Sequence, residues 1–115
     1  MSRWWRAFLF SKAGFVWAVR NERAFQEELI ALGFAVPVSF WISDASWQRS
    51  ALIASVLLVI LIETVNSAIE KLADQVSPEH NDAIKIAKDL GSLAVLIAIA
   101  IAGLFWIPAL LSRIA

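Results

Sequence analysis

The 23 residues from Leu90 to Ser112 contain no ionisable side chain and consist mostly of Leu, Ile and Ala. As an α-helix rising about 1.5 Å per residue, this run is roughly 35 Å long, enough to cross a hydrocarbon core of about 30 Å. Pro108 falls in its last turns, where neighbouring helices or interfacial water tolerate the missing donor. The run therefore predicts a membrane-spanning helix over residues 90–112.

A second uncharged run lies near the start of the chain. It comprises the 15 residues from Leu29 to Ser43 and ends near Trp41, a residue type that favours the membrane interface. The run predicts a shorter span over residues 28–44, and Pro37 is expected to kink it.

The middle apolar run is the one that bears on function. Only 13 uncharged residues, 50–62, precede Glu63, although apolar residues continue beyond it. The pattern predicts a span over 47–70 with an extension to about residue 76, provided that Glu63 and Asn66 lie inside the bilayer or at its edge. An ionisable residue at that depth is costly and marks a functional site.

Composition agrees with a membrane protein. With 60% hydrophobic residues and a mean hydropathy of +0.71, a chain of 115 residues has more apolar surface than it can bury alone in water. The runs lack polar alternation, which favours helices over strands and an all-α fold class. Ten basic and ten acidic residues leave no net charge, which argues against a nucleic-acid partner, and the absence of Cys excludes thiolate chemistry.

Basic residues are distributed unevenly along the chain. In the first 20 residues, most aromatic side chains fall on one side of a helical projection and most arginines on the other, which predicts an amphipathic surface helix over about residues 1–27. Eight basic residues lie in the N-terminal arm and the 71–89 connection, against Arg49 and Arg113 on the other side. This bias predicts that the N-terminus and the 71–89 connection are cytoplasmic.

Four polar residues share one face of the middle helix. Glu63, Asn66, Glu70 and Asp74 are spaced by three, four and four residues, so they fall within an arc of about 80°. Two other sets lie at the same membrane edge: Glu22, Glu27 and Glu28 before the first span, and Lys85, Lys88, Asp89 and Ser92 at the entrance to the last.

This inventory suits phosphoryl transfer. Carboxylates can hold Mg²⁺, lysines can neutralise phosphates, and a carboxylate beside a hydroxyl can accept its proton. The four glycines of the chain cannot form a P-loop, so nucleotide binding does not rest on a glycine cradle. An alternative hypothesis, from a different functional class, is that the chain is a small oligomeric proton-coupled transporter with Glu63 as the proton carrier.

Three sequence elements carry a family resemblance. Residues 63–70 read ETVNSAIE, residues 87–98 read AKDLGSLAVLIA, and residues 21–28 contain an N-E-x-A-F-x-x-E pattern. Together they resemble the small bacterial integral-membrane diacylglycerol kinase family, whose signature is E-x-x-N-S/T-A-I/L-E followed by A-K-D. The resemblance covers the chain from about Arg3 to about Leu111.

The resemblance implies a homotrimer of three-span protomers, each with an N-terminal surface helix, in the bacterial inner (cytoplasmic) membrane. It implies ATP and Mg²⁺ as cofactors, a lipid substrate and active sites shared between neighbouring subunits. By motif position, Glu63 is the general base, and Glu22 and Glu70 bind the metal. The resemblance places Arg3, Asn66, Lys88 and Asp89 in the nucleotide and catalytic region. The lipid contacts or supporting residues are Glu28, Trp41, Arg49 and Ser92.

One segment departs from the family pattern. The family often has an aromatic–His pair after the motif helix, whereas residues 78–81 here read Pro-Glu-His-Asn, with the histidine one position early. Glu79 is the residue that the resemblance aligns with a nucleotide contact.

The resemblance implies ATP-dependent phosphorylation of diacylglycerol to phosphatidic acid. The same family contains undecaprenol kinases, and the residues do not separate the two substrates, since both present a primary hydroxyl at the interface and a tail in the bilayer. The pair Gly91-Ser92 resembles the diacylglycerol branch.

Overall fold

The computed structural model describes residues 2–76 and 81–115, which form four α-helices and, within those ranges, no strand. The helices are α1 (Arg3–Asn21), α2 (Arg23–Ile42), α3 (Ser46–Val76) and α4 (Asp82–Ile114). The all-α prediction is confirmed.

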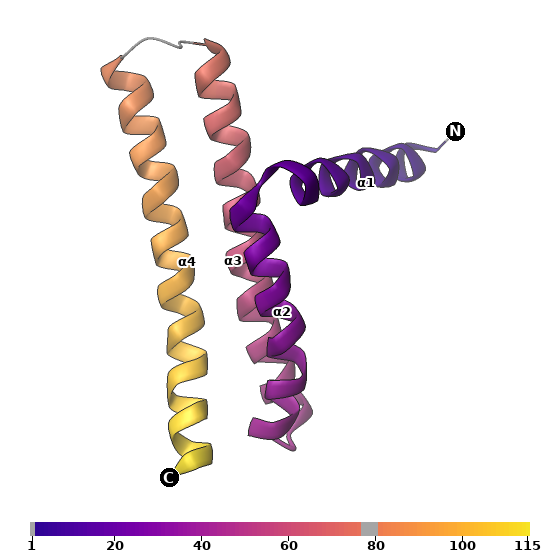
Figure 1. The fold of residues 1–115 in the computed structure, drawn as a ribbon, viewed down its shortest axis with the longest axis vertical. Coiled ribbons are helices and arrows are strands. Elements are labelled where there is room, and N and C mark those ends of the chain that lie inside the picture. Colours follow the sequence, from indigo (N-terminus) through magenta and orange to yellow (C-terminus); the bar gives the residue numbers. More distant parts are fainter. Residues whose placement is uncertain (1, 77–80) are drawn as a thin grey trace.

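The three long helices form a flat antiparallel bundle, and α1 leaves it sideways (Figure 1). α3 lies in the middle and packs against α2 on one side and α4 on the other, while α2 and α4 barely touch. α2 begins part-way up α3, so the last turns of α3 and the first turns of α4 extend beyond the level of α1 (Figure 1). We call the end of the bundle where α3 leads to α4 the connection end.

Local signals define the helix ends. The Ser2 side chain caps α1 by accepting from the Trp5 amide, and Asn81 caps α4 by accepting from the amides of Ala83 and Ile84. Between α1 and α2, Glu22 has an extended backbone (φ −111°, ψ 109°) that breaks the helix. Residues 23–27, expected on the surface helix, therefore lie on α2, which continues through Pro37 to Ile42.

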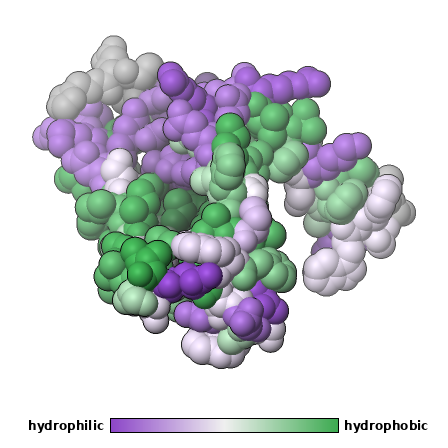
Figure 2. Space-filling view, turned by 60° about the horizontal axis from the view of Figure 1, so that its bottom comes forward, coloured by the Kyte–Doolittle hydropathy of each residue, from purple (hydrophilic) through white to green (hydrophobic). Residues whose placement is uncertain are grey.

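α2, α3 and α4 are each long and apolar enough to cross a membrane. Most of their large apolar side chains remain exposed in the single chain, so lipid or other protein chains must cover them. Hydrophilic residues gather at the connection end, and hydrophobic residues cover the middle of the bundle (Figure 2). Hydrophilic residues also lie at the opposite end, which comes forward in Figure 2, so the distribution fits helices that cross a bilayer with a polar end on each side.

Small and polar residues line the contact between α3 and α4. Gly91, Ala98 and Ala109 of α4 are buried, as are Leu52 and Ser55 of α3. Small residues let two membrane helices approach closely, so that dispersion contacts and interhelical hydrogen bonds replace the hydrophobic effect. One such bond is direct: the Trp106 indole donates to the Leu52 carbonyl and to Ser55 Oγ, each at 3.0 Å.

We expect Trp106→Phe to destabilise the α3–α4 contact by about 1 kcal/mol, because the ring is kept while the interhelical hydrogen bond is lost. The measurement is the unfolding free energy in detergent micelles. Trp47→Phe is the matched control, since the Trp47 side chain is 72% exposed. Equal effects of the two changes would show that the hydrogen bond contributes nothing.

Candidate active site

The polar stripe of α3 runs from the interior of the bundle to its surface. Asn66 is buried at 7% exposure, Glu63 is half-buried, and Glu70 and Asp74 are exposed toward the connection end. The four residues share one face of α3, as their spacing predicts, because they follow successive turns of one unbroken helix.

A cavity of about 210 Å³ lies between α1 and α3 beside this stripe. Its polar lining includes two carboxylates, Glu22 at the α1–α2 junction and Glu63 on α3. The other lining residues are mostly small or aromatic: Gly14, Trp17, Ala18, Phe25, Thr64, Ser67 and Ala68. The cavity thus pairs an apolar wall with carboxylates, which suits a lipid whose polar end carries the reacting group.

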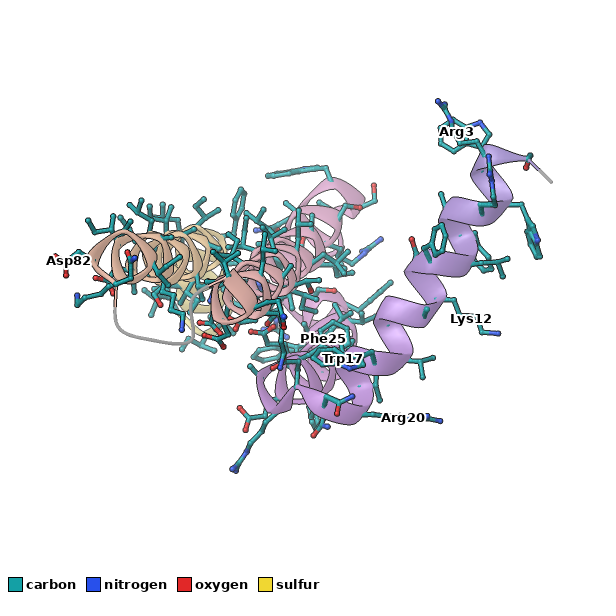
Figure 3. All side chains as sticks on the ribbon, turned by 90° about the horizontal axis from the view of Figure 1, so that it is seen from above. Arg3, Lys12, Trp17, Arg20, Phe25 and Asp82 are labelled. Carbon is teal, nitrogen blue, oxygen red and sulfur yellow. The ribbon has the colours of Figure 1, made fainter. Side chains whose placement is uncertain are left out.

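Contacts at the end of α1 bring Glu22 to this cavity. The Gln26 amide donates to the Val19 carbonyl at 2.6 Å, across the break, and the rings of Phe15 and Phe25 meet edge to face at 5.7 Å. Trp17 and Phe25 lie where α1 meets the bundle (Figure 3). The Lys71 ammonium on α3 lies 5.0 Å from the centre of the Trp17 ring, which ties α1 to α3.

Three other carboxyl groups come within electrostatic range of Glu63 here. Glu63 interacts with Glu70 and Glu22, and Glu28 on α2 interacts with Glu63. The Oε2 atom of Glu28 is buried without a hydrogen-bond partner. Like charges held close together and partly shielded from water cost stability and are typical of sites that bind a cation or move a proton. Among the described residues, no three Asp, Glu, His or Cys side chains form a closed metal cage.

Asn66 links the stripe of α3 to α4. Its Nδ2 donates a long hydrogen bond of 3.5 Å to Glu70 Oε1, while its Oδ1 is buried without a hydrogen-bond partner. The Oδ1 atom lies directly against Gly91 of α4. The amide therefore stands between a carboxylate at the surface and the backbone of the neighbouring helix.

Lys88 and Asp89 are neighbours in the chain with different partners. Lys88 Nζ lies 2.6 Å from Asp74 Oδ1, which joins α4 to the stripe of α3. This hydrogen bond raises the pKa of Lys88 above its ordinary value, so Lys88 is a cation at neutral pH next to the acidic stripe. Asp89 instead pairs with Lys85, one turn earlier on α4, at 2.7 Å.

A family model described as prokaryotic diacylglycerol kinase matches residues 9–110, nearly the whole described bundle. The chain belongs to the prokaryotic diacylglycerol kinase family. The matched range includes every carboxylate that surrounds Glu63. Membership of a kinase family favours the phosphoryl-transfer interpretation of these residues over the transporter interpretation.

Curated relatives agree with this assignment. A diacylglycerol kinase of Escherichia coli (strain K12) is 40% identical over 103 residues, which cover 85% of this chain and 84% of that protein. The diacylglycerol kinase of Pseudomonas aeruginosa is 37% identical, with 89% and 83% covered, and that of Helicobacter pylori is 31% identical, with 90% and 81% covered. The family resemblance predicted from three sequence elements is confirmed.

Several residues that the diacylglycerol kinase resemblance aligns with the site lie away from it in the single chain. Arg3 is at the free end of α1, where its guanidinium packs on Trp4, and Figure 3 shows it far from the bundle. Trp41, near the end of α2, and Arg49, near the start of α3, lie at the end of the bundle opposite the connection end. Arg49 there donates to the Ser43 carbonyl at 3.1 Å.

Two further residues were aligned with the site by the resemblance. Ser92 is exposed on α4, next to Gly91. Glu79, together with His80, lies outside the described residues.

Sequence reasoning missed two residues that shape the site in this family member. Trp17 was given no role in the site by the sequence, yet it lines the cavity and contacts Lys71. Gly91 was weighed only for substrate preference, yet it faces Asn66. A glycine inside an apolar helix is itself a signal for close approach of another group, and this signal could have identified Gly91.

Proposed function

We propose that this chain is an ATP-dependent lipid kinase that transfers the γ-phosphoryl group of ATP to the hydroxyl of diacylglycerol, giving phosphatidic acid and ADP. The observation that carries the proposal is the half-buried Glu63 in an apolar-walled cavity with Glu22, within electrostatic range of Glu70 and Glu28. Membership of the prokaryotic diacylglycerol kinase family supports the choice of reaction and substrate.

Glu63 is the general base in this proposal. The diacylglycerol oxygen attacks the γ-phosphorus, the bond from that phosphorus to the bridging oxygen breaks, and ADP leaves. The hydroxyl proton passes to the Glu63 carboxylate. The apolar wall of the cavity supports this role, because it can hold acyl chains while the hydroxyl stays beside the carboxylate.

Glu22 and Glu70 are the proposed metal ligands. Both are carboxylates near Glu63, and oxygen donors are what Mg²⁺ prefers. A site with one or two protein carboxylates that leaves its other positions to phosphates and water is typical of this ion. When bound, Mg²⁺ would screen the charge of the phosphates.

The nucleotide is proposed to lie toward the connection end, above Glu63. Lys88 supplies a cation there, Asn66 orients Glu70, and Asp89 stands beside Lys88 in the chain. Arg3 and Glu79 are further proposed nucleotide contacts. Because Arg3 lies at the free end of α1, its proposed role requires a neighbouring chain, as in the proposed homotrimer with shared sites.

Glu28 and Ser92 are proposed to support the lipid near its hydroxyl, and Trp41 and Arg49 to contact lipid at the opposite membrane face. The basic residues of α1 and of the connection end support an orientation with the N-terminus and the 71–89 connection in the cytoplasm. The chain is then a multi-pass protein of the bacterial inner membrane.

The purified protein should transfer ³²P from γ-labelled ATP to dioleoylglycerol in mixed micelles and yield labelled phosphatidic acid. Undecaprenol in the same micelles is the competing substrate, since the family resemblance also allows an undecaprenol kinase. Labelling of the polyprenol alone would assign the second substrate and overturn the first. Labelling of neither lipid would contradict the kinase proposal.

A further inference from the structure

One glycine of α4 occupies a place that no other residue type can fill without moving its neighbour. A Cβ atom built on Gly91 would overlap Asn66 Oδ1 and come within 3.2 Å of Asn66 Cγ. The second glycine of α4 differs: a Cβ on Gly103 would meet only Ile107 Cδ1, at an ordinary 3.7 Å. The close approach is thus specific to the turn of α4 that passes Asn66.

The Asn66 side chain has little freedom to give way. It is buried at 7% exposure, and its amide is a planar group whose oxygen and nitrogen move together. Oδ1 lies against Gly91, while Nδ2 reaches Glu70 Oε1 at 3.5 Å. Any displacement of the oxygen by a side chain on α4 therefore rotates the nitrogen relative to the Glu70 carboxylate.

We propose that Gly91 is a positioning residue for phosphoryl transfer, which acts on Glu70 through Asn66. The missing side chain leaves a notch in α4 that holds the Asn66 amide, and the amide in turn orients the Glu70 carboxylate. This inference rests on the proposed function, in which Glu70 is a metal ligand. The proposal predicts that Gly91 affects binding of the nucleotide and its metal but not binding of the lipid.

The kinetic test compares Gly91→Ala with Gly103→Ala, the matched change on the same helix. Gly91→Ala should raise the KM for Mg-ATP at least about fivefold, because a displaced ligand binds poorly, and leave the KM for dioleoylglycerol within about twofold. Gly103→Ala should behave as the unmodified protein in both measurements. An unchanged KM for Mg-ATP in Gly91→Ala would overturn the proposal, and so would equal changes in both KM values.

A double-mutant cycle of thermal stability tests the contact between Gly91 and Asn66 without a measurement of activity. Gly91→Ala should lower the thermal midpoint in detergent, whereas the same change in an Asn66→Ala background should lower it little, because the overlapping side chain is gone. If Gly91→Ala does not fold, Asn66→Ala should restore folding in the double variant. Additive effects, or no restoration, would remove the basis of the inference.

The two measurements separate failure of this inference from failure of the proposed function. If the unmodified protein phosphorylates neither lipid, the kinase proposal fails, and the positioning role fails with it even where the stability cycle shows coupling. If the unmodified protein is a kinase and the cycle shows no coupling, only the role of Gly91 is wrong.

Discussion

Glu63→Gln should reduce phosphoryl transfer to diacylglycerol by at least about 100-fold, because the amide keeps the size of the side chain but cannot accept the hydroxyl proton. The folded state should not suffer, since the substitution removes a charge that is repelled by Glu70, Glu22 and Glu28. We therefore expect a thermal midpoint equal to or above that of the unmodified protein. Loss of activity without loss of stability is typical of a catalytic group.

The matched control for this variant is Glu27→Gln. Glu27 lies on α2 one residue before Glu28, but its side chain is 65% exposed and pairs with Arg23 at 3.0 Å on the surface. Its substitution should leave turnover unchanged. Full turnover in Glu63→Gln would contradict the assignment of the general base and leave the family assignment intact.

Glu70→Gln should raise the Mg²⁺ concentration needed for half-maximal turnover at least about tenfold, or abolish turnover at every concentration, because a neutral amide is a much weaker ligand for Mg²⁺. The amide oxygen of glutamine can still accept from Asn66 Nδ2, so the local packing is expected to persist. The measurement is a Mg²⁺ titration of kinase activity at fixed, saturating lipid.

Two controls distinguish a metal ligand from a general support of the site. The KM for diacylglycerol should stay within about twofold in Glu70→Gln, since the lipid cavity is lined by Glu63 and Glu22 and not by Glu70. Glu27→Gln should give the same Mg²⁺ titration as the unmodified protein. An unchanged titration in Glu70→Gln with normal turnover would refute its role as a ligand.

The end of the surface helix shows where sequence patterns stop being informative. Neither glycine nor proline stands near Glu22, so the helix break at Glu22 had no strong local signal in the sequence. Contacts between segments surround the break: Lys71 contacts Trp17, and Gln26 donates to the Val19 carbonyl. These contacts also bring Glu22 to the cavity.

The sequence by itself determined which segments are apolar enough to enter the membrane and which polar residues share a face of α3. Both are local properties, set by the length of an apolar run and by the 3.6-residue period of the helix. The family motifs likewise belong to the sequence, and they identified Glu63, Asn66 and Glu70 as candidates.

Only the tertiary structure decided which groups on different helices meet. Helical period does not say how far each helix is rotated toward its neighbours, or how closely two helices approach. That Asn66 lies against Gly91, and that Glu22 and Glu63 line one cavity, follows from packing between segments far apart in the chain. Such packing depends on the shapes of both partners at once, which no single stretch of sequence contains.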